Sequence, residues 1–260
     1  MSETERQILA SNPIMEAFGN AKTTRNDNSS RFGKYIEVSR ASGNRPLMSQ
    51  ILFDKTHEIV GARVRTYLLE RSRLVYQPES ERNYHIFYQL LAGAPSKERK
   101  DLSLDQSPDS FAYLAGGGPT STPIQGVDDA KEFRDTQTAL STVGISVERQ
   151  WHIFKLLAAL LHLGNVKITQ VRTDAVVADD DPALALATNL LGLPAGDFKK
   201  WTVKKQLVTR SEKIVTSLGG AQAAVVRDSV AKFVYSCLFD VGNNVLDQML
   251  TLLVARRCRQ

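Results

Sequence analysis

Apolar side chains recur at helical spacing over much of the chain and alternate only in short segments. Residues 84–91 carry an aromatic stripe closed by Gly93, a pattern typical of a helix packed on a core. Residues 151–163 are apolar on almost every side, which indicates a buried helix ending at Gly164. Long helical patterns with few alternating segments predict a mainly helical α+β fold.

Capping residues indicate further helices in the second half of the chain. Asp181-Pro182 is expected to start one helix and Gly192 to end it. A longer C-terminal helix is expected to break at residues 241–244, Val-Gly-Asn-Asn. The stripe of that helix expected to face the core comprises Val226, Ser229, Val230, Phe233, Val234 and Cys237.

The residue pattern in the first part of the chain predicts one short helix followed by strands. Asn12 is expected to cap the helix, with Pro13 in its first turn and Gly19 at its end. Alternating apolar residues after this helix predict three strands. The predicted strands cover residues 32–38, 48–53 and 60–67.

Two polar stretches, residues 95–109 and 115–126, separate the predicted helices. Three consecutive glycines at 116–118 could cradle a phosphate, but no lysine or helix start follows closely. A surface loop is therefore the preferred interpretation. His152 and His162 lie too far apart to bind a metal ion together, and both are interpreted as core histidines.

Composition narrows the class of protein. The 260 residues are 42% hydrophobic, enough for a real core, and the net charge of +5 comes from interspersed acidic and basic residues. This charge pattern does not require a nucleic-acid partner. Membrane insertion is not expected, because no apolar run reaches the roughly 18 residues that a membrane-spanning helix needs. Two cysteines, Cys237 and Cys258, suit a reducing compartment, so a cytoplasmic location is expected.

One polar run, residues 26–31 (Asn-Asp-Asn-Ser-Ser-Arg), has the side chains needed to hold a Mg²⁺-bound phosphate. The Ser30 hydroxyl is the candidate Mg²⁺ ligand, because this cation prefers oxygen ligands. Ser29 could hydrogen-bond the terminal phosphate or the attacking water, and the Asn26 amide could donate to a phosphate oxygen. Arg31 suits an ion pair with a carboxylate that closes the site. By composition alone the run could equally be a solvated turn.

The residues around this run decide between the two interpretations. N-x-x-S-S-R occurs in the first switch loop of kinesin-like and myosin-like motors, but kinesins usually continue with Ser-His, whereas Phe32-Gly33-Lys34 follows here. Residues 12–23, NPIMEAFGNAKT, resemble the helix and loop that lead into this switch in myosin motor domains. Later segments resemble the following strand and helices of those domains, in the same order. These segments are residues 61–73, 81–93, 156–164 and 227–240.

Over about residues 3–240 the chain therefore resembles a myosin motor domain, most of all class V myosins of fungal type. The resemblance implies a helical upper motor subdomain with a few strands of the central sheet, within a P-loop NTPase-type motor domain. It also implies Mg-ATP as cofactor, actin filaments and the remainder of the motor domain as partners, and a place in the actin cytoskeleton. Ser29 and Arg31 would be catalytic, Asn26, Ser29 and Ser30 would bind nucleotide, and residues 241–260 would be a divergent tail.

Two motifs that ATP hydrolysis of this kind requires are missing from the sequence. The only Gly-Lys pair, Gly33-Lys34, is followed by Tyr35 rather than Ser or Thr, and no Asp has Gly three residues later. The chain alone is therefore expected not to hydrolyse ATP. The alternatives to a segment of an actin-based motor are a non-enzymatic actin-binding or regulatory fragment and a basic adaptor unrelated to motors.

A second candidate site lies at residues 199–213, where six basic side chains accompany one acidic side chain and β-branched residues suggest a protruding hairpin. From charge alone, a solvated surface is the simpler interpretation. The resemblance implies instead an actin-facing loop. Its predicted actin contacts are Lys204, Lys205, Arg210 and Glu212, the last at the family's position for an acidic or phosphorylatable residue.

Overall fold

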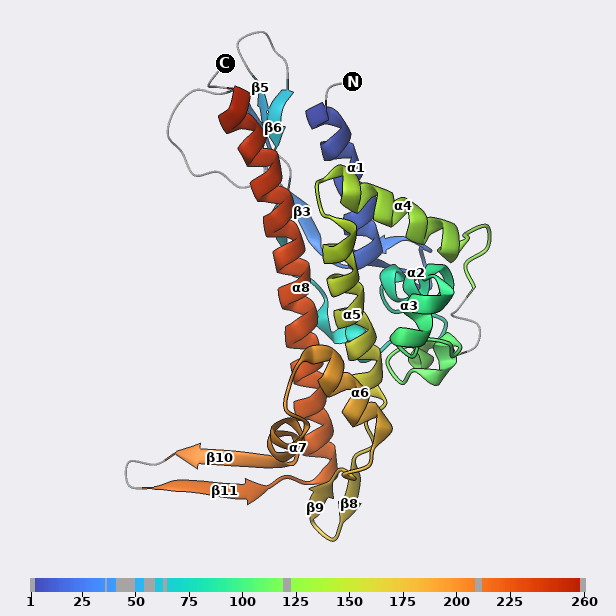
Figure 1. The fold of residues 1–260 in the computed structure, drawn as a ribbon, viewed down its shortest axis with the longest axis vertical. Coiled ribbons are helices and arrows are strands. Elements are labelled where there is room, and N and C mark those ends of the chain that lie inside the picture. The colour runs from blue at the N-terminus through green and yellow to red at the C-terminus, as the bar shows by residue number, and fades with distance from the viewer. Residues whose placement is uncertain are drawn as a thin grey trace.

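The structure, a computed structural model, describes residues 3–35, 37–40, 50–53, 59–62, 65–118, 123–208 and 212–257. Its largest element is α8 (Gly220–Arg257), which runs along the length of the molecule and contacts both α1 (Glu3–Gly19) and α5 (Val147–Gly164) (Figure 1). Helices predominate and the strands are short, which confirms the mainly helical α+β fold.

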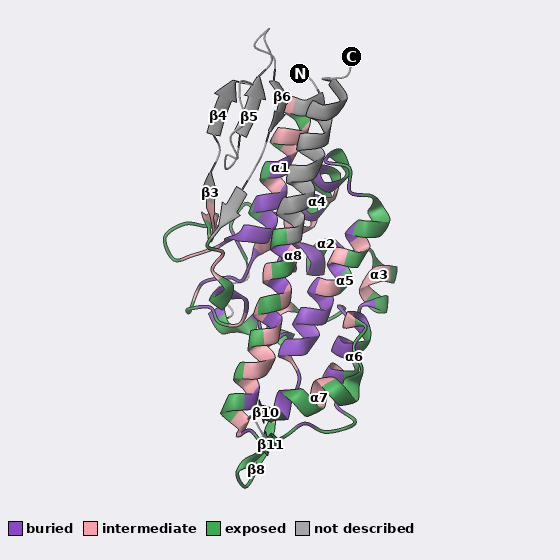
Figure 2. Cartoon of the chain, turned by 90° about the vertical axis from the view of Figure 1, so that its left-hand side faces the viewer, coloured by how far each residue is buried: buried purple, intermediate pink, exposed green. Residues whose placement is uncertain are grey.

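The core forms around α5, as its apolar sequence predicts. Its second half is buried almost without interruption (Figure 2). Ser146 caps the helix by accepting a hydrogen bond from the backbone of Arg149. On one side, α2 (His85–Gly93) packs on α4 (Asp129–Thr142), and the Phe133 ring of α4 lies 4.9 Å from that of Phe154 in α5. The hydrophobic pattern predicts α2 and α5 but not α4.

The strands that follow α1 confirm the three predicted strand regions in outline. β1 (Asn20–Ala21) pairs with β2 (Ser29–Ser30), and β3 (Gly33–Tyr35) pairs with β7 (Arg65–Tyr67), both antiparallel. A separate sheet has the order β4-β5-β6, with β4 and β5 parallel and β5 and β6 antiparallel. Its strands are β4 (Glu37–Arg40), β5 (Gln50–Phe53) and β6 (Ile59–Ala62).

The remaining elements connect these parts and form the end of the molecule opposite the termini (Figure 1). The predicted helix after Asp181 is present as α6 (Pro182–Leu191). The Asp181 carboxylate caps this helix by accepting a hydrogen bond from the Leu184 N–H, and Gly192 ends it with a φ of +69°, which favours glycine. The other elements are η1 (Arg71–Leu74), α3 (Ser96–Asp101), η2 (Pro108–Ser110), η3 (Ala115–Gly117), β8 (Thr169–Val171), β9 (Asp174–Val176), α7 (Ala195–Val203), β10 (Lys204–Val208) and β11 (Lys213–Ser217).

Two predicted helix boundaries are wrong. α1 begins at Glu3, so Asn12 is not its N-cap and Pro13 lies inside it. An interior proline costs roughly 3 kcal/mol, and burial of Ile14 and Phe18 on the core offsets that cost. α8 also continues through residues 241–244, where Gly and Asn each cost at most about 1 kcal/mol of helix propensity. Packing along a long helix outweighs penalties of that size.

The predicted core stripe of α8 is correct only in part: Val226 and Val234 are half-buried against the core, whereas other members face solvent. Among the residues of this helix whose burial is described (220–240), the fully buried ones are Ala223, Ala231, Tyr235 and Phe239. Phe233 is 65% exposed and Cys237 is exposed, because the buried face is rotated away from the predicted stripe. Of the two histidines assigned to the core, His162 is buried but His152 is exposed.

Candidate functional site

The polar run of residues 26–31 lies at the end of a short β-hairpin. β1 and β2 pair Asn20 with Ser30 and Ala21 with Ser29, so the loop between them projects from the ends of the strands. The backbone N–H of Thr23 donates to the Asn26 carbonyl oxygen at 2.8 Å, which closes the turn. The Asn26 side-chain oxygen accepts from the Asn28 N–H at 2.9 Å, so its NH₂ group is the part that could donate to a ligand.

The two predicted phosphate-site serines follow each other on β2 and therefore differ in environment. Ser29 is half-buried and its hydroxyl accepts a hydrogen bond from Arg31 Nη1 at 3.3 Å, whereas Ser30 is exposed. Ser30 offers an exposed, uncharged oxygen and Asn26 an exposed amide donor, the two kinds of group that a Mg²⁺-bound phosphate requires. These residues therefore fit Mg-ATP chemically.

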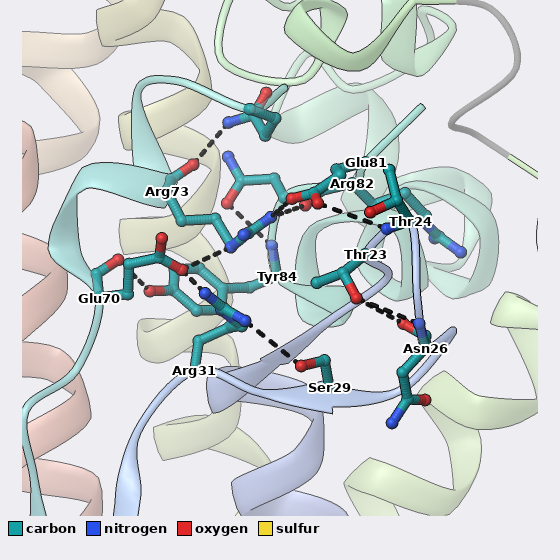
Figure 3. Close-up of polar contacts among 12 residues, drawn as sticks. Thr23, Thr24, Asn26, Ser29, Arg31, Glu70, Arg73, Glu81, Arg82 and Tyr84 are labelled. Atoms are coloured by element: carbon teal, nitrogen blue, oxygen red, sulfur yellow. Dashed lines mark hydrogen bonds and ion pairs between the residues drawn. The ribbon is translucent and has the colours of Figure 1, made fainter. Parts of the chain in front are cut away.

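Arg31 forms the ion pair with a carboxylate that its chemistry predicts. Its Nε lies 2.6 Å from Glu70 Oε2, and the Glu70 N–H donates to the Arg31 carbonyl oxygen at 2.8 Å (Figure 3). Arg73 Nε donates to the same oxygen, so Glu70 Oε2 accepts from both arginines. Burial alone would raise the pKa of Glu70, but hydrogen bonds from the two guanidinium groups outweigh burial and lower it.

Sequence reasoning missed a second set of contacts on the other side of the loop. Asn28 Oδ1 accepts from Asn20 Nδ2 at 2.9 Å and contacts His85 Nε2 at 3.2 Å, and Asn28 Nδ2 donates to Glu16 at 3.1 Å. Burial and then the nearby Arg82 charge lower the pKa of His85 to about 4, so the ring is neutral at pH 7. A hollow of about 240 Å³ adjoins these side chains and is lined in addition by Asp27, Asp129 and Glu132.

The second candidate site is a two-stranded ribbon, but its position in the sequence needs correction. Residues 199–203, assigned to the actin-facing loop, are the last turn of α7, and the Lys199 ammonium pairs there with Asp179. The hairpin consists of β10 and β11, and all its described strand residues are exposed (Figures 1 and 2). Lys204 and Lys205 lie at its base, Glu212 is exposed just before β11, and Arg210 lies outside the described residues.

The hairpin is not only basic. Its strands expose apolar side chains in addition to the lysines, and cross-strand pairs bring Leu207 beside Ile214. Both residues are more than a third exposed, at 61% and 38%. A ribbon with apolar and cationic side chains in water is typical of a surface that meets a partner.

Within the described part of the chain, no group of three or more His, Cys, Asp or Glu side chains could hold a metal ion. The Ser30 hydroxyl remains the predicted Mg²⁺ ligand. In the same part of the chain, no helix is both long and apolar enough to cross a membrane.

Comparison with known proteins identifies the family. The model of the myosin head (motor domain) matches residues 1–254. The chain belongs to this family. It is 60% identical over 240 residues to Myosin-2 of Saccharomyces cerevisiae, 56% identical over 240 residues to Myosin-4 of the same yeast, and 50% identical over 240 residues to Myosin-52 of Schizosaccharomyces pombe. Each alignment covers 92% of the chain but only 14–15% of the relative, so this part of the myosin head is a small part of each protein.

Proposed function

We propose that the chain is a segment of a class V-like, actin-based motor that uses Mg-ATP, contributing the first nucleotide switch and part of the actin interface. The observation that carries the proposal is the loop of residues 26–31, which presents Asn26 and Ser30 to solvent while Arg31 is held by a carboxylate. Membership in the myosin head family and the resemblance of residues 3–240 to fungal class V myosins support the same conclusion.

The loop side chains divide the work of holding a phosphate. Ser30 would ligate Mg²⁺, the Asn26 amide would donate to a phosphate oxygen, and Ser29 would hydrogen-bond the terminal phosphate or the attacking water. Mg-ATP, when bound, supplies the phosphate on which these groups act. Arg31 holds Ser29 through Nη1 and is itself fixed by Glu70, so it orients the serine and closes that side of the loop.

The hairpin of β10 and β11 is the proposed actin contact. Lys204 and Lys205 would approach acidic side chains of the filament, and Arg210 and Glu212 are proposed as further contacts. Exposed charges of this kind accelerate encounter and are screened by salt. The hairpin lies far along α8 from the nucleotide loop, so charge changes there should leave basal hydrolysis unaffected (Figure 1).

A chimera tests the actin contact. This chain would replace the matched 240 residues of Saccharomyces cerevisiae Myosin-2. Lys204→Glu with Lys205→Glu is expected to weaken co-sedimentation of the chimera with actin by about tenfold at low salt, mainly through slower association. Basal ATP hydrolysis should stay at the level of the unmodified chimera.

The matched control makes the same charge change elsewhere. Lys97→Glu with Lys100→Glu alters two exposed lysines on α3, which lies away from the hairpin (Figure 1). This control should bind actin as the unmodified chimera does. Equal binding by the hairpin variant and the control at low salt would remove the hairpin from the proposed interface.

A further inference from the structure

A buried arginine beside the switch loop contacts two carboxylates at once. Arg73, in η1, has only 4% of its side chain exposed. Its Nε donates to Glu70 Oε2 at 2.8 Å, and its Nη1 lies 2.9 Å from Glu81 Oε2 (Figure 3). The second contact is an ion pair without hydrogen-bond alignment, and Nη1 also donates a hydrogen bond to the Arg82 carbonyl oxygen at 3.1 Å. A buried charge needs such partners to offset its desolvation.

Each of the two carboxylates reaches one side of the switch loop. Glu81 Oε1 accepts from the backbone N–H of Thr24 at 3.3 Å, before the loop's phosphate-site residues. Glu70 Oε2 accepts from Arg31 Nε at 2.6 Å, and Arg31 Nη1 donates to Ser29 at 3.3 Å, after the turn. The contacts thus run without a break from one side of the loop, through the buried arginine, to the other.

We infer that Arg73 is a positioning residue of the switch loop, one buried charge that fixes the two sides of the loop relative to each other. The inference rests on the proposed function, because it assigns Arg73 a role in presenting Asn26 and the serines to phosphate. Without Arg73, the described cationic partner left to Glu70 is Arg31, and Glu81 loses its only described cationic partner. A lysine could hold one carboxylate but not both, because it lacks the guanidinium fork.

Hydrogen exchange of the 260-residue chain tests the structural half of the inference. Arg73→Met should accelerate exchange of the Thr24 and Arg31 amides by about tenfold or more, because the loop loses charge-assisted contacts. Arg73→Lys should give an intermediate rate. Arg71→Met, which removes an exposed arginine from the same 3₁₀ helix, is the matched control and should exchange as the unmodified chain does. Amides of α5 should be unchanged in all three variants.

The chimera with yeast Myosin-2 tests the functional half. Arg73→Met should lower kcat for ATP hydrolysis by about tenfold while KM for ATP stays within about twofold, since Arg73 touches neither nucleotide nor metal. Arg73→Lys should recover part of kcat. Arg71→Met should match the unmodified chimera in both parameters.

Three outcomes separate this inference from the proposed function. Unchanged Thr24 and Arg31 exchange in Arg73→Met overturns the inference, and so does acceleration that extends through α5, because Arg73 would then support the fold generally. If Arg31→Ala impairs hydrolysis and Arg73→Met does not, the inference fails alone. If Arg31→Ala leaves hydrolysis unchanged while loop exchange accelerates in Arg73→Met, the proposed function fails and Arg73 still positions the loop.

Discussion

Replacing Arg31 with alanine in the chimera is expected to lower ATP hydrolysis by about a hundredfold, the scale of losing a preorganised polar group at a reaction centre. The variant removes the donor to Ser29 and the 2.6 Å contact to Glu70 in one step. Glu70 then keeps only the contact from Arg73, and the end of the loop loses its fixed position. Single-turnover hydrolysis measures the effect free of product release.

Arg25→Ala is the control for this prediction, because Arg25 is an exposed arginine in the same loop. It should hydrolyse ATP as the unmodified chimera does. A charge swap between Arg31 and Glu70 should not restore activity. Arg73 Nε lies 2.8 Å from Glu70 Oε2, so an arginine at position 70 would place two positive charges side by side. Hydrolysis by Arg31→Ala within about twofold of the unmodified rate would mean that residues 26–31 are not a nucleotide switch.

Tyr235→Ala should cost roughly 3–5 kcal/mol of unfolding free energy, the range for deleting a buried aromatic side chain. Tyr235 is 1% exposed, and its ring stacks on that of Tyr84 at 4.8 Å. Its hydroxyl donates to the Phe18 carbonyl oxygen at 2.6 Å, and that buried acceptor would lose its side-chain partner. Tyr235 thus joins α8 to α1 and, through Tyr84 and Phe87, to α2. Urea unfolding of the 260-residue chain measures the loss.

Phe233→Ala on the same helix is the matched control. Phe233 lies two residues before Tyr235 but is 65% exposed, so the change should stay within about 0.5 kcal/mol. Equal losses in the two variants would mean that the buried face of α8 is assigned incorrectly.

Sequence patterns predicted the helices whose ends carry a strong local signal. Gly93, Gly164 and Gly192 each end a helix as expected, and the α5 segment is apolar enough to show its burial directly. α4 was missed because its core contact rests on a few residues such as Phe133 and Leu140 within a polar sequence. The signal that could have found it is Asp128, whose side chain caps the helix by accepting from two backbone N–H groups.

The candidate site shows the same division between local and long-range information. The chemistry of the loop and the need of Arg31 for a carboxylate follow from the residues themselves. The partner's identity does not, because Glu70 lies 39 residues away and is brought close by the pairing of β3 with β7. The burial of Arg73 was not predicted for a different reason: Glu70 and Glu81 are near it in the sequence, but only the folded chain encloses its side chain between them. A polar residue is predicted to be exposed unless the fold supplies its partners.

The Mg²⁺ dependence of ATP hydrolysis by the chimera tests the switch assignment most directly, because Ser30 is the proposed ligand. Ser30→Ala is expected to need about tenfold more Mg²⁺ for half-maximal hydrolysis, since one oxygen ligand is lost. Ser30→Thr retains the hydroxyl and should follow the unmodified chimera. A Ser30→Ala curve that superimposes on the unmodified one would contradict the assignment of residues 26–31 as the nucleotide switch.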